Sequence, residues 1–259
     1  MPTLNQQFQS QGFLVLERFV PIPKPAMPSC FGPKHSSDLI IKDIPPYFRQ
    51  LIKAKAAMII FWNRAIKSPS FFEKDAFDEK VELKQDLFHS LNKIGHALHD
   101  LDPMFASFSR SKEMRELAAE LGLEDHVLIQ SMMIFKHAKI GGKVDVHQDA
   151  TFLYTEPQSC IGFWFALEDA TIENGCMWAA AGGHKTSLRS RFQRKEGGGT
   201  EMQILDEQPY DINSMKPLEV PKGSCIVLLV FYPITVCPIP AVNQDRLSPF
   251  IPFTGCKLP

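Results

Sequence analysis

The sequence predicts a mainly β (α+β) fold, an antiparallel sandwich or jelly roll with helices packed on one side. After residue 125, short apolar runs of strand length alternate with turn residues, and no long helical pattern interrupts them. Helical patterns are confined to the first half of the chain. Strands and helices segregated in this way favour an antiparallel sheet covered by helices over a parallel α/β architecture.

In the first half, the turn residue Gly12 precedes an apolar strand at 13–20, and the proline-rich stretch 21–34 excludes a helix or a central strand. Apolar residues at helical spacing predict helices at 83–98 and 111–122, and a further helix is expected at 45–66, where the apolar residues form a block that does not follow one face. The helix at 111–122 has Ser111 as its N-cap and Gly122 at its end.

In the second half, apolar runs predict strands at residues 127–136, 161–170, 176–181 and 225–232. Residues 187–201 are basic and then glycine-rich, and we expect an exposed loop there. Residues 225–242 carry no charge, but prolines interrupt them. A buried strand followed by an extended tail is therefore expected there, and not a membrane-spanning helix.

Bulk composition excludes several functional classes. The 259 residues are 44% hydrophobic and carry a net charge of −1, so no basic field predicts nucleic-acid binding. The six cysteines are scattered without zinc-site spacing, which indicates reduced thiols. The polar N-terminus does not read as a signal peptide, so the expected location is the cytoplasm, with the nucleus as an alternative.

One short motif, His147-Gln148-Asp149, suggests metal chemistry. On a strand, residues i and i+2 face the same side, so His147 and Asp149 would project together while Gln148 faces away. An imidazole and a carboxylate supply two of the three ligands in a 2-His-1-carboxylate Fe(II) site. The alternative is a surface pair at a strand end, since short motifs also arise by chance.

Four blocks around this motif extend the evidence. They are NKIGHALHDLDPMF at 92–105, QSMMIFK at 130–136, HQDATFLYTEP at 147–157 and EDATIENGCMW at 168–178. In order and spacing they resemble the phytanoyl-CoA dioxygenase family, over about residues 71–186 and again at 12–20. The resemblance implies a double-stranded β-helix, a cupin-like jelly roll with supporting N-terminal helices. It also implies an Fe(II)- and 2-oxoglutarate-dependent dioxygenase, with ascorbate as a further expected reductant.

The resemblance also assigns roles to residues. His147 and Asp149 would bind iron, Lys93 would hold a carboxylate of 2-oxoglutarate, and Met132 and Trp164 would line the cosubstrate pocket. An ammonium group suits an anionic carboxylate, and apolar walls keep water from a reactive centre. A solvated Lys93 and purely structural Met132 and Trp164 are the alternatives.

The family pattern fails at its third ligand, a histidine on a late strand. His184 is the last histidine of the chain and matches a different loop of the family. The ligand is expected within residues 231–236, which read FYPITV and contain no imidazole; Tyr232 would make another kind of site. Arg246 lies roughly where the family places an arginine that pairs with 2-oxoglutarate, a weak match.

The ends of the chain also depart from the family. We expect one domain over 1–259, best supported over 71–190, with 21–70 and 225–259 atypical and the C-terminal part incomplete. This divergence suggests an alternative isoform or an imperfect gene model. The sequence leaves three functions open: a weak or inactive dioxygenase acting on a small molecule with O2, a non-catalytic binding or regulatory domain, and a cupin-like metal protein. The sequence specifies neither substrate nor oligomeric state.

Overall fold

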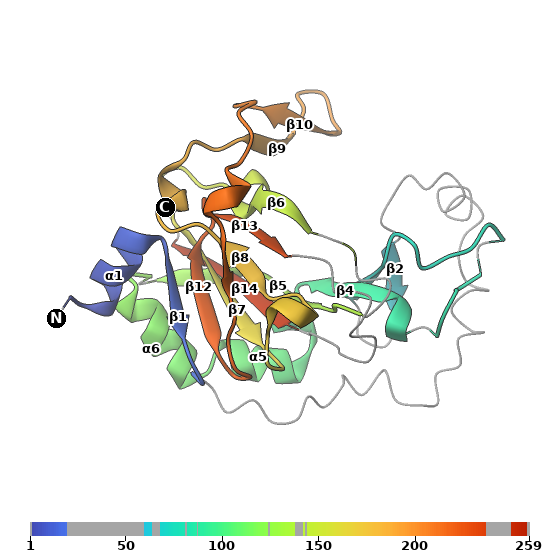
Figure 1. Ribbon diagram of the computed structural model, residues 1–259, viewed down its shortest axis with the longest axis horizontal. Coiled ribbons are helices and arrows are strands. Elements are labelled where there is room, and N and C mark those ends of the chain that lie inside the picture. Colours follow the sequence, from blue (N-terminus) through green and yellow to red (C-terminus); the bar gives the residue numbers. More distant parts are fainter. Residues whose placement is uncertain are drawn as a thin grey trace.

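The computed structural model describes residues 2–19, 60–63, 68–80, 82–86, 88–123, 125–137, 142, 144–236 and 250–257. Two antiparallel sheets form its centre (Figure 1). The larger has eight strands in the order β1 (Phe13–Leu16), β12 (Cys225–Leu229), β7 (Cys160–Ala166), β14 (Phe250–Lys257), β5 (His126–Ile134), β4 (Leu91–His96), β3 (Ser68–Phe72) and β2 (Ile60–Asn63). The smaller has four, in the order β11 (Lys216–Leu218), β8 (Met177–Ala179), β13 (Pro233–Val236) and β6 (Val144–Gln148). This arrangement confirms the predicted mainly β class.

Helices cover one face of the larger sheet. They are α1 (Leu4–Gln11), α4 (Leu98–Leu101), α5 (Pro103–Ser109) and α6 (Lys112–Glu120). Short 3-10 turns lie at η2 (Phe88–Ser90), η3 (Asp149–Thr151), η4 (Ile172–Asn174), η5 (Gly183–Lys185) and η6 (Ile212–Ser214). No helix among the described residues is both long enough and apolar enough to cross a membrane.

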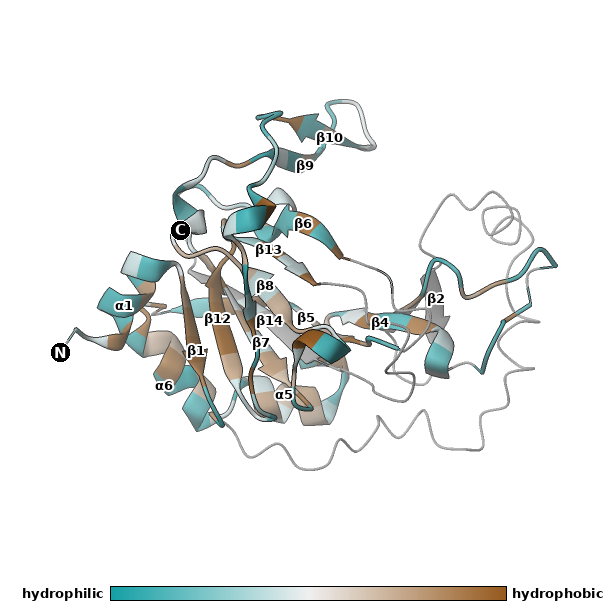
Figure 2. Cartoon of the chain, in the orientation of Figure 1, coloured by the Kyte–Doolittle hydropathy of each residue, from teal (hydrophilic) through white to brown (hydrophobic). Residues whose placement is uncertain are grey.

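The alternation of side chains along β7 divides the core into two layers. Phe163 and Phe165 pack with the helices, together with Phe8 of α1 and Leu117 of α6. Trp164 points to the other side, into the space between the two sheets. We call this second set the inner cluster: Trp164, Ala166, Ala170, Cys176, Met177, Ala179, Val220, Ile226, Leu228, Tyr232 and Ile234. Because β7 is buried on both faces, its sequence is continuously apolar, and Figure 2 shows the same hydrophobic concentration on β1 and β12.

The C-terminal segment takes part in both sheets. β13 lies between β6 and β8, and β14 lies between β7 and β5. The sequence predicts an incomplete C-terminal part, yet its described residues occupy central positions. The apolar run from Cys225 forms strand β12, which pairs with β1 and β7, and it does not form a spanning helix.

Two predicted helices are wrong where the structure describes them. Residues 91–96 form strand β4, between β3 and β5, and residues 60–63 form strand β2. The leucines in the predicted 83–98 helix have helical spacing, but residues 91–96 pair in the sheet because tertiary contacts override local propensity. At Gly95 the strands approach so closely that an added Cβ would lie 2.6 Å from the Met132 Cβ. The other residues of the predicted 45–66 helix lie outside the described residues.

The basic stretch 187–201 is largely exposed, as predicted, but it is not a loop, since much of it forms a hairpin of β9 (Ser190–Arg194) and β10 (Thr200–Ile204). Three glycines with positive φ, at 197–199, make its turn. Other local predictions are confirmed. Ser111 caps α6 by accepting a hydrogen bond from the Met114 backbone N–H at 3.3 Å, and Gly12 ends α1 with φ +83°.

Candidate active site

His147 and Asp149 lie side by side where β6 ends and η3 begins. His147 Nε2 is 3.4 Å from Asp149 Oδ1, and about a third of each side chain is exposed. His147 Nδ1 lies 2.8 Å from the Asp145 carbonyl oxygen, which can only accept, so Nδ1 carries the proton. In the neutral ring Nε2 therefore carries the lone pair that a metal could bind, with the Asp145 carbonyl fixing the ring from behind, and in the protonated ring Nε2–H donates to Asp149.

The distance between these two atoms suits a shared metal ion. Bonds from imidazole nitrogen or carboxylate oxygen to a metal such as zinc are about 2.0–2.2 Å. Two atoms bound to one such ion are thus at most about 4.2 Å apart, and 3.4 Å falls within that limit. Burial alone would lower the His147 pKa, but the hydrogen bond and the charge of Asp149 outweigh it and raise this pKa.

Gln148, between the two, faces the other way and is fully buried. Its amide nitrogen donates to the carbonyl oxygens of Ser187 (3.2 Å) and Phe231 (2.8 Å). Its amide oxygen accepts from the Arg189 backbone N–H (3.0 Å) and from Tyr210 Oη (3.1 Å). All four hydrogen-bonding positions of the amide are used, which fixes the end of β6 and hence both potential ligands. The sequence places Gln148 on the opposite face but does not reveal this network.

Lys93, on β4, is electrostatically close to the pair. Burial lowers its pKa, while the charge of Asp149 acts in the opposite direction. Its Nζ also lies 5.1 Å from the centre of the Phe71 ring. A partly buried cation is thus near enough to influence the charge of both Asp149 and His147. Its assigned role stays a prediction.

The other residues predicted to line the cosubstrate pocket are distributed differently. Met132 lies on β5 opposite Gly95, next to the strand that carries Lys93. Trp164 is buried in the inner cluster, where its backbone neighbours are Ile226 on β12 and Pro252 on β14. Arg246 lies outside the described residues.

His96 is a further polar group on this wall. Its Nδ1 is 2.7 Å from Gln130 Nε2, so Nδ1 accepts and the amide donates. Its ring lies edge-on to Phe71, and burial, followed by the charge of Lys93, lowers its pKa. The sequence indicates a pocket-wall or surface residue here, and its Gln130 partner could not be found from spacing alone.

The position opposite His147 decides what kind of metal site this is. β13 runs antiparallel to β6, and Ile234 is the direct partner of His147. Tyr232, the other candidate in this segment, is fully buried, and its hydroxyl donates to the Ala180 carbonyl oxygen. Burial raises the pKa of Tyr232 to about 12, so it is not an available iron ligand. Within the described residues, no three His, Cys, Asp or Glu side chains form a group that could hold a metal.

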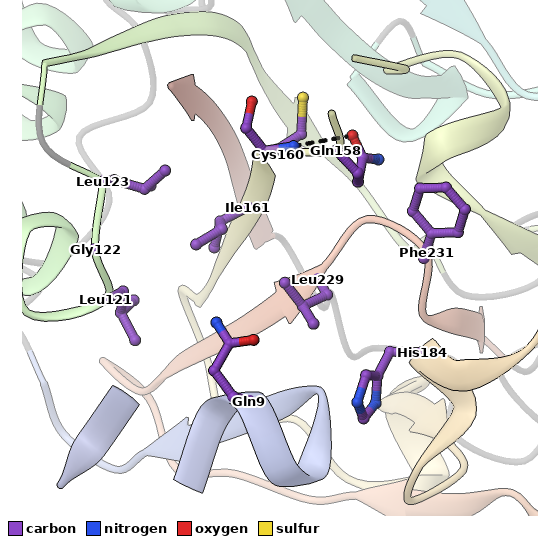
Figure 3. Close-up of a pocket in the computed structure, with 11 residues that line it drawn as sticks. Gln9, Leu121, Gly122, Leu123, Gln158, Cys160, Ile161, His184, Leu229 and Phe231 are labelled. Carbon is purple, nitrogen blue, oxygen red and sulfur yellow. Dashed lines mark hydrogen bonds between the residues drawn. The ribbon is translucent and has the colours of Figure 1, made fainter. Parts of the chain in front are cut away.

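A separate cavity of about 530 Å³ lies between α1, the end of α6 and the start of β7 (Figure 3). Its walls include Leu121, Ile161, Leu229 and Phe231, with His184 and Gln158 among the polar groups. His184 stacks on Tyr232 with ring centres 6.2 Å apart. None of the residues assigned to iron or 2-oxoglutarate lines this cavity, so it is distinct from the His147–Asp149 site.

Comparison with known proteins agrees with this geometry. The family model "Phytanoyl-CoA dioxygenase (PhyH)" matches residues 49–230. A "Phytanoyl-CoA dioxygenase" of Arabidopsis thaliana is 39% identical over 228 residues, 85% of this chain and 77% of that protein. The chain belongs to the phytanoyl-CoA dioxygenase family. The Bos taurus "Phytanoyl-CoA dioxygenase domain-containing protein 1" is also similar, 37% identical over 240 residues, 88% of this chain and 81% of that protein.

Among solved structures, the epimerase SnoN in complex with Fe3+, alpha ketoglutarate and nogalamycin RO superposes with a TM-score of 0.58. The identity is 12%, and the match covers 98% of this chain and 82% of SnoN. At this identity the likeness shows the fold alone. Together with the family, it confirms the predicted double-stranded β-helix of an oxygenase.

The iron and 2-oxoglutarate implied by the family fit these residues only in part. His147 and Asp149 are correctly arranged for two ligands, and Lys93 supplies a cation beside them. At the position directly opposite His147, however, Ile234 offers no lone pair. The described residues therefore do not form the complete three-ligand iron centre.

Proposed function

We propose that this chain is a domain of the Fe(II)- and 2-oxoglutarate-dependent dioxygenase type that retains the cosubstrate side of the site and hydroxylates weakly or not at all. The complete reaction inserts oxygen from O2 into a carbon–hydrogen bond of a small molecule and converts 2-oxoglutarate to succinate and CO2. The single observation that carries the proposal is the grouping of Lys93, His147 and Asp149 opposite Ile234.

Lys93 is the residue that this chain contributes to cosubstrate binding. An ammonium group that is already partly desolvated loses less hydration on binding a carboxylate than an exposed lysine does. Apolar neighbours such as Phe71 and Met132 exclude water from the same wall. Binding of a dicarboxylate therefore depends on Lys93 more than on the metal.

Calorimetry with 2-oxoglutarate under anaerobic conditions, with and without Fe(II), tests this proposal. We expect measurable binding that Lys93→Met weakens by about ten- to a hundredfold, the range for a charged hydrogen bond. Lys93→Arg should retain part of the affinity, and Lys195→Met, on the exposed hairpin turn, should leave it unchanged. Absence of 2-oxoglutarate binding to the unaltered chain would contradict the proposal and favour a scaffold that binds another partner.

Activity separates the proposal from a fully functional enzyme, the second candidate, which family membership favours. The measurement is succinate formation from 2-oxoglutarate in air, with Fe(II) and with a chelator. The proposal expects little or no iron-dependent succinate. Robust iron-dependent turnover, abolished by Asp149→Ala, would show that two protein ligands suffice.

A further inference from the structure

We infer that Ile234 occupies the position of the missing third ligand, and that replacing this one side chain by a metal ligand completes a facial metal site. The inference rests on the proposed role of His147 and Asp149 and deepens it. It assigns the position of the missing ligand to one side chain, Ile234, within the segment 231–236.

The register of β6 and β13 carries the first step. Ile234 pairs directly with His147, and Pro233 pairs with Gln148. Direct partners in an antiparallel pair project on the same face with Cβ atoms about 4.5–5.5 Å apart. Ile234 therefore shares a face with the imidazole of His147, whereas Pro233 shares a face with the buried amide of Gln148.

The neighbours of Ile234 along β13 exclude the alternatives. The Thr235 hydroxyl donates to the Val144 carbonyl oxygen at 2.6 Å and is engaged in the sheet. Val236 pairs with Val144, at the far end of β6 from Asp149. Of the residues on β13, Ile234 is thus the one that is both opposite His147 and on its face.

The surroundings of Ile234 suit a buried side chain of imidazole size. Ile234 is 8% exposed and belongs to the inner cluster with Trp164. The two existing ligands are already held in place, one by the Asp145 carbonyl and both through the Gln148 network. A single additional donor at position 234 would thus meet a preorganised pair.

The test uses the full chain with Co(II) as the probe, measured by calorimetry and by visible absorption. We expect Ile234→His to bind Co(II) at least about tenfold more tightly than the unaltered chain, comparable with the 10–100-fold effects of outer-sphere partners of metal sites. The matched control is the double variant Ile234→His with Asp149→Ala, in which the gain should disappear.

A second variant guards against misfolding. Ile234→Cys places a smaller apolar side chain in the cluster and supplies a thiolate, so bound Co(II) should show a sulfur-to-metal charge-transfer band. If folded Ile234→His and Ile234→Cys proteins both bind Co(II) no better than the unaltered chain, the inference is overturned. If Ile234→His does not fold, the cysteine variant alone decides.

The outcome also distinguishes this inference from the proposed function. If the unaltered chain binds Co(II) in an Asp149-dependent way and neither variant gains affinity, Ile234 is not the ligand position although the pair binds metal. If no protein shows Asp149-dependent binding, the His147–Asp149 pair itself is not a metal site, and both ideas fail. Binding of 2-oxoglutarate through Lys93 is measured separately and is independent of either result.

Discussion

The Tyr210 hydroxyl donates to the Gln148 amide oxygen at 3.1 Å and so connects the loop before η6 to the strand that carries the candidate metal ligands. The two residues are 62 positions apart in the chain. Gln148 is fully buried, and its four amide contacts join three other segments, at residues 187–189, Tyr210 and Phe231, to the end of β6. The arrangement of His147 and Asp149 therefore depends on an uncharged residue that touches neither a metal nor a cosubstrate.

Replacing Gln148 by alanine is expected to destabilise the protein by at least about 2–3 kcal/mol, because buried groups on Phe231, Arg189 and Tyr210 lose their partner. Urea unfolding followed by circular dichroism measures this change. Gln203→Ala, at an exposed position on β10, should change the unfolding free energy by no more than about 0.5 kcal/mol. An equally small change for Gln148→Ala would show that the network contributes little.

Replacing Tyr232 by phenylalanine separates a structural role from a metal-binding one. The hydroxyl donates to the Ala180 carbonyl in a buried setting, and its removal is expected to cost about 1 kcal/mol. Because this hydroxyl is engaged and its pKa is raised to about 12, Co(II) affinity should not change. Calorimetry with Co(II) checks this result, and a large loss of affinity in a stable Tyr232→Phe protein would restore the tyrosine as a ligand.

The sequence predicts the second half of the fold better than the first. The strands β5, β7, β8 and β12 follow from apolar runs of strand length bounded by turns, and this signal does not depend on which distant strand each one pairs with. Leu91, Ile94 and Leu98 share a helical spacing and therefore predict a helix, whereas strand β4 forms because it packs closely against β5 at Gly95. Propensity carries no information about that approach.

The candidate site shows a similar division. The two-residue period of a strand predicts that His147 and Asp149 project on the same side. That Lys93 lies near this pair could be expected only from the family resemblance. The position of the missing ligand could be narrowed only to residues 231–236 from the sequence. Choosing Ile234 needs the register between β6 and β13, which depends on a pairing of segments far apart in the chain.

The pH dependence of stability should include a contribution from Glu73. This residue is 5% exposed, and burial raises its pKa despite hydrogen bonds from Asn92 and the Gly142 backbone N–H. The folded protein then holds the Glu73 proton to higher pH than the unfolded chain does. This contribution to stability is complete below the ordinary glutamate pKa of 4.5 and is lost as the pH rises through the folded value.

The variant Glu73→Gln lacks this titration and keeps an amide oxygen for Asn92. The free energy of unfolding of the variant should therefore increase relative to that of the unaltered chain as the pH rises from about 4 to 7. Urea unfolding across that range measures the difference, with Glu79→Gln at an exposed turn as the control. A difference that is constant with pH would argue against a raised Glu73 pKa.

The turn at Gly12 combines two constraints that a pair of variants can separate. Gly12 has φ +83°, and a Cβ there would overlap the His184 ring and lie 2.8 Å from Tyr232 Cδ2. Gly197 has φ +90° in the hairpin turn, but a Cβ there meets nothing within 4 Å. Both alanine variants incur the cost of left-handed backbone, about 1–2 kcal/mol, and only Gly12→Ala adds a steric conflict.

We therefore expect Gly12→Ala to lower the unfolding free energy by clearly more than Gly197→Ala does. Since His184 and Tyr232 stack on each other, displacement of His184 should also reshape the cavity between α1 and β7. Chemical denaturation gives the two free energies. Equal losses of unfolding free energy would mean that His184 can move away from an added Cβ without loss of stability. Backbone conformation would then be the only reason for glycine at position 12.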